Sequence, residues 1–261
     1  EAWMRVQDRP IFKSVASINF DDFMTASEAV RTIVQSGLAP TNCRLLDPIE
    51  AFVNAGSDSP GGVLVLGFES ADHPQDHKLT RALEICADFG GKPAPQKSES
   101  SSSSADEWRS SFLRMPYQRD VLAAHSMIVE TFESACTWDD WPNFYQLVSQ
   151  AAYGAMSDVG VTGVLACRFT HVYPDGVAPY FGVYAAGKWD SLLGQWDHIK
   201  SAVSSAILKA GGTITHHHAV GRDHRPGYDE QRSDLFAEAL RSVKSTVDPQ
   251  GILNPGVLFD I

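Results

Sequence analysis

Three consecutive histidines, His216, His217 and His218, are the residues whose type and spacing in this chain best suit chemistry. Imidazole has the unperturbed pKa nearest to neutrality, so a group of imidazoles can transfer protons, bind an anion or hold a metal ion. The triplet follows the glycine pair at 211–212 and lies far from either end of the chain. We therefore treat this segment as the candidate site.

The histidine segment directly follows the predicted end of a helix, and we expect it to be a strand. In a strand His216 and His218 share one face and His217 lies on the other, so three ligands on one metal would require the backbone to bend. No HExxH pattern supplies further zinc ligands. We predict no metal centre. Imidazoles that merely satisfy buried backbone groups remain an alternative to a site for proton transfer or anion binding, which we favour.

The elements that must position these histidines follow from hydrophobic periodicity. Residues 190–210 have helical spacing that stops at Gly211, as expected of a helix C-terminus. Strands at 161–173 and 180–186 are joined by Pro174-Asp175-Gly176, which predicts a hairpin. Further strands are predicted at 11–20, 43–46, 63–68 and 127–136, and further helices at 75–89, 142–156 and 229–247, with another that Asp21 or Asp22 would cap and that runs to Gly37.

Hairpin signals and the lack of regular βαβ alternation predict an α+β fold, with a largely antiparallel sheet and helices packed on one face. A serine-rich stretch at 93–106 reads as a flexible surface loop, and residues 108–124 as partly helical. Neither GxGxxG nor GxxxxGK[ST] occurs, so the chain is expected to hold no complete nucleotide site.

Charge and composition limit the class of function. The 261 residues carry a net charge of −11, which argues against nucleic acid or an anionic membrane as a partner. No run of about 20 apolar residues and no leader segment is seen, so we expect a cytoplasmic protein without a transmembrane segment. The four cysteines are widely spaced and are predicted to be buried, reduced thiols.

Two segments together resemble a known family. GGTITHHHAVGRDHRPGY at 211–228 and VDPQGILNPGVL at 247–258 resemble the C-terminal region of FAD-linked oxidases of the vanillyl-alcohol-oxidase type. Members that oxidise lactate or glycolate more often have Gly-Glu-His where this chain has the histidine triplet. This difference points to the branch of the alkyldihydroxyacetonephosphate synthases.

The resemblance implies a two-domain architecture in which this chain, residues 1–261, is the C-terminal substrate cap, ending in a helix and tail at 229–261. An N-terminal FAD-binding domain of the same polypeptide, absent here, would be the partner and would bind most of the FAD. The start at Glu1 agrees with an excised or truncated piece. A homodimer is left open.

The resemblance also implies roles for individual residues. Segments at 117–120 and 129–134 match the part of the family that carries an active-site arginine, here Arg119, and 167–170 with 180–181 match the part that carries an active-site tyrosine, here Tyr180. Arg119 would bind phosphate or carboxylate, and Tyr180 would polarise oxygen and transfer protons. His216, His217 and His218 would line the flavin and substrate, with His217 or His218 as proton shuttle; His216, His218 and Asn254 would contact the cofactor.

Each assignment has a structural alternative. Arg119 could be a surface arginine, Tyr180 a packed strand aromatic and Asn254 an ordinary turn residue. Arg168, within a predicted strand, could pair with a buried acid instead of a ligand.

Three functions are compatible with this picture. The resemblance implies an enzyme that exchanges the acyl group of an acyl-dihydroxyacetonephosphate for a fatty alcohol through an adduct with the flavin. The alternatives are an FAD-dependent hydroxy-acid dehydrogenase, for D-lactate or glycolate, and a non-catalytic ligand-binding module. The fragment alone is expected to be inactive.

Overall fold

The computed structural model describes residues 1–94, 113, 117 and 119–258. Most of the predicted serine-rich loop at 93–106 lies outside the described residues, and the predicted helix at 108–124 is described only in part. The described chain forms two compact units. Unit 1 comprises residues 1–125 and 166–179, and unit 2 comprises residues 126–165 and 180–261.

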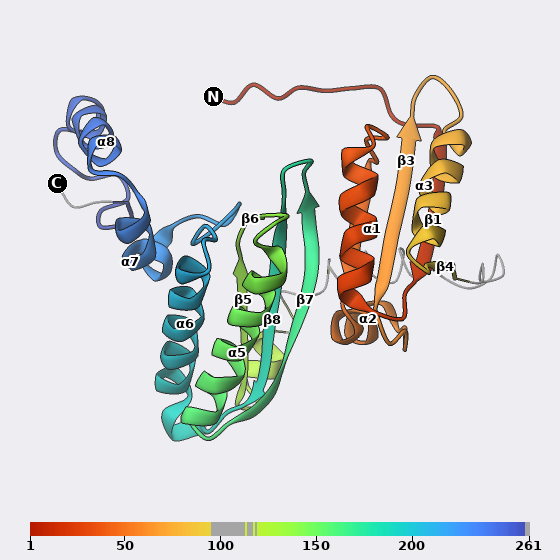
Figure 1. Ribbon diagram of the computed structural model, residues 1–261. Coiled ribbons are helices and arrows are strands. Elements are labelled where there is room, and N and C mark those ends of the chain that lie inside the picture. Colours follow the sequence, from red (N-terminus) through yellow and green to blue (C-terminus); the bar gives the residue numbers. More distant parts are fainter. Residues whose placement is uncertain (95–112, 114–116, 118, 259–261) are drawn as a thin grey trace. The chain divides into compact units, whose positions relative to one another are not determined.

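Unit 1 is built around antiparallel strands (Figure 1). The strands are β1 (Phe12–Asn19), β2 (Asn42–Leu46), β3 (Val63–Ser70) and β4 (Lys92–Pro93), with the unit 1 parts of β7 (Thr162–Val172) and β8 (Gly176–Ala186). They run in the order β4-β1-β3-β2-β7, and β8 adjoins β7. The predicted hairpin joins β7 to β8, and in it Tyr173 N–H donates to the Gly176 carbonyl over 2.8 Å. β8 therefore begins earlier than the predicted residue 180.

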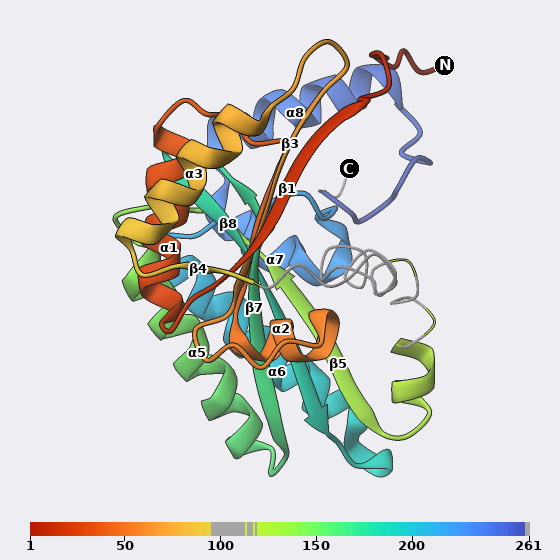
Figure 2. The ribbon, with the colours of Figure 1, turned by 90° about the vertical axis from the view of Figure 1, so that its right-hand side faces the viewer.

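Helices α1 (Phe23–Gln35) and α3 (Asp76–Asp88) lie beside each other next to β1 and β3 (Figure 2). The α1 N-cap is Asp22, whose carboxylate accepts the Thr25 N–H over 2.7 Å, and the buried face of α1 includes Val30 and Ile33. Both features agree with the sequence-based expectation. A short helix that was not predicted, α2 (Pro48–Ala55), follows β2.

A buried ion pair joins α2 to β7 within unit 1. The Arg168 guanidinium contacts the Glu50 carboxylate, and each side chain is only 3% exposed. Beside them Asp47 caps α2, and its carboxylate accepts N–H groups from Glu50 and Cys167, each over 2.7 Å. Arg168 thus pairs with a buried acid, one of the two roles considered for it from the sequence.

Unit 2 places two helices on one face of its strands. β5 (Met127–Glu133) pairs antiparallel with the unit 2 part of β8, and β6 (Cys136–Thr137) also pairs with β8. Helices α5 (Trp141–Asp158) and α6 (Leu192–Lys209) pack against each other, and α6 contacts β5 (Figure 1). A 3-10 turn, η1 (Trp189–Ser191), precedes α6, and α7 (Gly221–Gln231) and α8 (Asp234–Val247) complete the unit.

The β5 side chains show why its two faces differ. Ile128, Glu130 and Phe132 alternate along β5 and are buried, and Lys200 of α6 donates to Glu130 over 2.8 Å. Glu133 has the opposite parity and belongs to the other face. The helices therefore cover one side of β5, and the last carboxylate of the strand lies on the side where the candidate site forms.

The predicted α+β fold class with an antiparallel sheet is confirmed. The prediction for the last helix of the chain, in contrast, is wrong. Instead of one helix at 229–247 there are α7 and α8, separated near Ser233, which caps α8. α7 was not predicted, and Pro226 and Gly227, which both disfavour a helix, lie inside it.

The four cysteines are buried and form no disulfide, as predicted. Burial raises the pKa of Cys43, Cys86 and Cys136 to about 12, so these thiols are protonated near neutral pH and are poor nucleophiles. Among the described helices, none combines the length and apolar composition that crossing a bilayer requires.

Candidate functional site

The glycine pair sets the path of the chain as it leaves α6. Gly211 has a φ of +81°, a left-handed conformation that suits glycine, and its N–H donates to the Leu208 carbonyl over 3.0 Å. A Cβ atom on Gly212 would lie 2.3 Å from a ring carbon of Phe144 and 2.6 Å from the Ser134 hydroxyl. The chain can pass this close to α5 and to Ser134, the residue after β5, only because residue 212 lacks a side chain.

The histidines lie in a bent loop and not in the predicted strand. Thr213 N–H donates to the Ala135 carbonyl over 3.1 Å, and the Thr213 carbonyl accepts the Ser134 hydroxyl over 2.7 Å. Further along, the Thr215 hydroxyl donates to the His218 carbonyl over 2.9 Å, closing a turn around the triplet. The bend removes the strand alternation that would have placed His217 on the opposite face from its neighbours.

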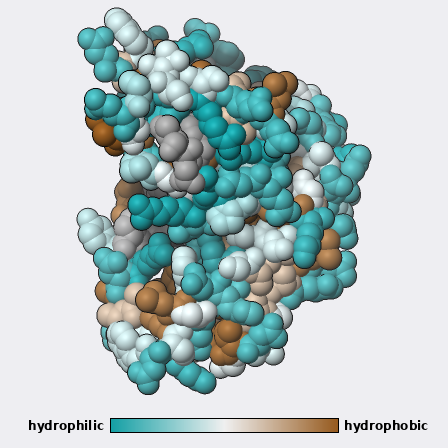
Figure 3. Space-filling view, turned by 90° about the vertical axis from the view of Figure 1, so that its left-hand side faces the viewer, coloured by the Kyte–Doolittle hydropathy of each residue, from teal (hydrophilic) through white to brown (hydrophobic). Residues whose placement is uncertain are grey.

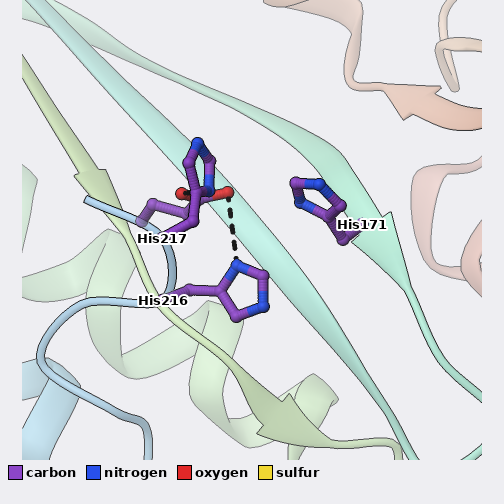
Figure 4. A group of neighbouring side chains, drawn as sticks. His171, His216 and His217 are labelled. Atoms are coloured by element: carbon purple, nitrogen blue, oxygen red, sulfur yellow. Dashed lines mark ion pairs between the residues drawn. The ribbon is translucent and has the colours of Figure 1, made fainter. Parts of the chain in front are cut away.

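All three imidazoles approach one buried carboxylate, that of Glu133 at the end of β5. His217 Nδ1 contacts Glu133 Oε2 directly, whereas His216 Nδ1 lies 3.8 Å from Oε1 and His218 Nε2 lies 3.8 Å from Oε2. The Glu133 side chain has no exposed area, while those of His216, His217 and His218 are 18%, 49% and 32% exposed. In Figure 4 the rings of His216 and His217 lie near this carboxylate, and the dashed line marks the His216 ion pair. His171, drawn in the same picture, belongs to unit 1.

Tyr180 joins this group from the neighbouring strand. It is the cross-strand partner of Glu133 in the β5–β8 ladder, and its half-buried ring meets the His218 ring edge to face, with centroids 5.7 Å apart. The geometry thus brings together the phenol and the three imidazoles that the sequence analysis singled out. We refer to Glu133, Tyr180, His216, His217 and His218 as the imidazole cluster.

Electrostatics within the cluster favour a neutral His218. Burial is the main cause that lowers the pKa of His218, and His217, His224 and Lys200 lower it further, while the negative charge of Glu133 opposes them. A neutral imidazole beside a phenol can accept the phenolic proton or donate to its oxygen. His218 is thus an imidazole with a lowered pKa in ring contact with Tyr180.

The remaining candidate residues lie elsewhere. Arg119 is exposed and belongs to unit 1, so its proposed contact with the substrate stays a prediction. Asn254 is exposed in the tail after α8, with a left-handed φ of 47° that asparagine tolerates in turns. Its contact with a cofactor also stays a prediction.

Glu133 is the member of the cluster that sequence reasoning missed. In the sequence it belongs to residues 129–134, which resemble the family segment that carries the active-site arginine. The parity of β5 offered a signal, because Glu133 has a different parity from the apolar residues Ile128 and Phe132. The residues that Glu133 contacts on that face belong to a loop that is far away in the sequence.

A carboxylate with two imidazoles is also a set of ligand types that divalent cations use. Ligand atoms of Glu133, His216 and His217 lie within 4.8 Å of one another. Glu133 and His217 form a direct ion pair, and two ligands of one tetrahedral zinc ion would stand roughly 3.3 Å apart. That unit 2 binds no metal remains our prediction.

Comparison with known proteins places the chain in a family. Residues 9–258 match the model of the FAD linked oxidases, C-terminal domain. The alkyldihydroxyacetonephosphate synthase of Dictyostelium discoideum is 26% identical over 288 residues, a match that covers 99% of this chain and 46% of that protein. The glycolate oxidase subunit GlcD of Bacillus subtilis is 21% identical over 270 residues, covering 99% of this chain and 53% of that subunit.

A solved structure supports the same relationship at the level of the fold. A crystal structure of alkyldihydroxyacetonephosphate synthase superposes with a TM-score of 0.69 at 23% identity, over 95% of this chain and 45% of that one. The chain thus spans about half the length of the relatives it matches. Because the family model covers nearly all of its residues, the chain belongs to the FAD linked oxidases and represents their C-terminal domain.

Proposed function

We propose that this chain is the substrate-binding cap of an FAD-dependent enzyme that exchanges the acyl chain of an acyl-dihydroxyacetonephosphate for a fatty alcohol. The observation that carries the proposal is the meeting of Tyr180, His217 and His218 around buried Glu133. Relatives named alkyldihydroxyacetonephosphate synthase that align along 99% of the chain support it.

The residues of the cluster fit one end of a flavin. Tyr180 and His218 are half-buried and His217 is half-exposed, so a planar ring can approach their polar atoms without unfolding the loop. Clustered backbone N–H groups of a glycine-rich phosphate loop are not encoded in this sequence. The bound flavin would supply the capacity to accept and return an electron pair, and another part of the polypeptide would hold its pyrophosphate.

The chain's own side chains would handle protons and charge. Removal of a proton next to a ketone needs a base and a donor that stabilises the developing charge on oxygen. His217 is proposed to accept that proton, and Tyr180 to donate its hydroxyl to the ketone oxygen, with His218 exchanging a proton with the phenol. Arg119 would bind the phosphate group of the substrate through its planar guanidinium.

Oxidation of a small hydroxy acid is the second candidate. It is favoured by the relatives named D-2-hydroxyglutarate dehydrogenase and glycolate oxidase subunit. Here the imidazole would take the hydroxyl proton of the substrate while a hydride leaves to the flavin. The same cluster would serve, with a carboxylate in place of the phosphate.

The discriminating experiment uses the full-length flavoprotein that carries this chain. One assay supplies an acyl-dihydroxyacetonephosphate with a fatty alcohol and follows the ether product, and the other supplies D-lactate or glycolate with a dye acceptor. Exchange without dye reduction supports the synthase. Dye reduction without exchange supports the dehydrogenase. If neither assay shows activity, the chain is interpreted as a non-catalytic ligand-binding module.

An FAD-binding domain of the same polypeptide is the proposed partner, and α8 offers a surface for it. Phe236, Val243 and Val247 follow helical spacing and are 53%, 59% and 72% exposed; we call them the α8 stripe. Figure 3 faces the side on which α8 lies in Figure 1 and shows hydrophobic residues in groups among hydrophilic ones. Since exposed apolar stripes commonly mark interfaces, and the relatives contain about as much chain again, we propose that this domain covers the stripe.

A further inference from the structure

The three imidazoles differ in how they meet Glu133. Only a ring nitrogen near 3 Å or closer can share a hydrogen bond with a carboxylate oxygen. Among the three ion pairs that the described cluster makes with Glu133, that of His217 is the shortest, and those of His216 and His218 are both 3.8 Å long. The carboxylate therefore distinguishes His217 from its neighbours.

The buried Glu133 carboxylate determines which ring nitrogen of His217 carries the proton. Glu133 has no exposed side-chain area, and an ionised carboxylate acts only as a hydrogen-bond acceptor. A neutral His217 that faces it must accordingly carry its proton on Nδ1, which leaves Nε2, across the ring, as the acceptor. Because the His217 side chain is 49% exposed, a ligand can reach the ring on the side away from the carboxylate.

We propose that Glu133 is a positioning residue, which fixes the tautomer and orientation of His217 so that Nε2 of His217 is the base of the proposed reaction. This inference rests on the proposed function and chooses between the histidines that the sequence left open. The proton leaves the substrate, binds Nε2 and gives an imidazolium whose charge is balanced by Glu133. It returns from the same nitrogen, so the side chains end each turnover unchanged.

The strand ladder explains why the carboxylate can hold this geometry. Glu133 is the last residue of β5 and is paired with Tyr180, and the next residue, Ser134, holds the histidine loop through its bond to the Thr213 carbonyl. Two rigid attachments thus fix the distance between the carboxylate and the loop. A group acting on a base through such a support resembles the role of the acid in a hydrolase triad.

The first test is independent of activity. Nitrogen-15 NMR of the histidine side chains in the chain reports which ring nitrogen carries the proton, with His198, 45% exposed on α6, as an internal reference. We expect the Nδ1–H tautomer at His217 in the unchanged chain and a mixture of tautomers in Glu133→Gln. An Nε2–H tautomer at His217 in the unchanged chain would overturn the inference, even if Glu133→Gln does not fold.

The second test measures kinetics in the flavoprotein, with whichever of the two substrates it turns over. Glu133→Gln should lower kcat about 100-fold or more while KM changes by less than about threefold, as for a lost orientation of a base. Glu130→Gln is the matched control, because Glu130 lies on the same strand, is buried and binds Lys200 instead of an imidazole. If Glu130→Gln disturbs the His217 tautomer as much as Glu133→Gln does, or if Glu133→Gln keeps full kcat, the inference fails. If the flavoprotein acts on neither substrate, the proposed function is refuted. The NMR test then decides the role of Glu133 by itself.

Discussion

Glu133 and Tyr180 are direct partners across the β5–β8 ladder, one a fully buried carboxylate and the other a half-buried phenol. Their pairing places both at the point where the histidine loop crosses the strands. His217 contacts the carboxylate and His218 contacts the phenol, so two adjacent residues of the loop meet two different partners. The two imidazoles therefore lie in different surroundings, one beside a negative charge and one beside a phenol ring.

Removal of the Tyr180 hydroxyl should affect catalysis and not folding. In the full-length flavoprotein Tyr180→Phe is expected to lower kcat about 100-fold, because the ring keeps its contact with His218 while the donor is lost. Tyr184→Phe is the matched control, since Tyr184 lies on the same face of β8 four residues further on and is likewise half-buried. Steady-state kinetics check both variants, and equal kcat values for the two would refute the role of Tyr180.

The close approach at Gly212 predicts a large cost for a single methyl group. Gly212→Ala should lower the free energy of unfolding by about 1–3 kcal/mol, because the new Cβ overlaps Phe144 and Ser134. Gly154→Ala, inside α5, has open space around its Cβ and should be neutral or stabilising by about 0.5–1 kcal/mol. Urea unfolding of both variants measures the contrast, and a neutral Gly212→Ala would show that the loop can move away.

The Arg168–Glu50 pair is expected to behave as a buried ion pair. Arg168→Met should destabilise the protein by about 3–5 kcal/mol, because it leaves the Glu50 carboxylate charged and buried without its guanidinium. The double variant Arg168→Met/Glu50→Leu should recover most of this loss, since neither charge of the pair is then left buried without the other. Thermal or urea unfolding of the unchanged protein, the Arg168→Met and Glu50→Leu single variants and the double variant decides the matter, and additive losses would argue against coupling.

Stability should depend on pH through Asp47. Burial is the main cause that raises the pKa of Asp47 to about 7, against about 3.9 for an unfolded aspartate. The folded state thus holds this proton more tightly, so the contribution is greatest below about pH 4 and is lost as the pH rises toward 7, by on the order of 2–4 kcal/mol.

Asp47→Asn tests this dependence, because asparagine cannot ionise. Its amide opposes the Cys167 N–H and lowers stability by the same amount at every pH. Urea unfolding between pH 4 and pH 8 should show a smaller decline for the variant than for the unchanged protein. Parallel curves would mean that Asp47 is ionised throughout the range.

The α8 stripe predicts a change in flavin retention. Exchanging Phe236 and Val243 for serine in the full-length protein should reduce the FAD that remains after purification, because the apolar contact with the flavin-binding domain would be lost. Leu193→Ser, on α6 and 79% exposed, is the control. Absorbance of bound flavin relative to protein measures the effect, and unchanged retention would place that domain elsewhere.

The sequence was sufficient for features that depend on neighbours along the chain. The helix after Asp22, the turn at Pro174-Asp175-Gly176 and the end of α6 near Gly211 were predicted correctly, because capping, glycine backbone freedom and hydrophobic period act within a few residues. The histidine triplet could be recognised in the same way, since residue type alone gives imidazole its chemistry.

Tertiary structure alone decided how these imidazoles are used. The histidine segment, expected to be a strand, is a bent loop, because Ser134, Ala135 and Gln231 bind its backbone, and these partners are distant in the sequence. No residue near Glu133 in the sequence indicated that it would contact the histidines. Likewise, α7 is a helix although it contains Pro226. Long-range hydrogen bonds and burial outweigh local propensity at such places, so one carboxylate gathers three histidines that a regular strand would have separated.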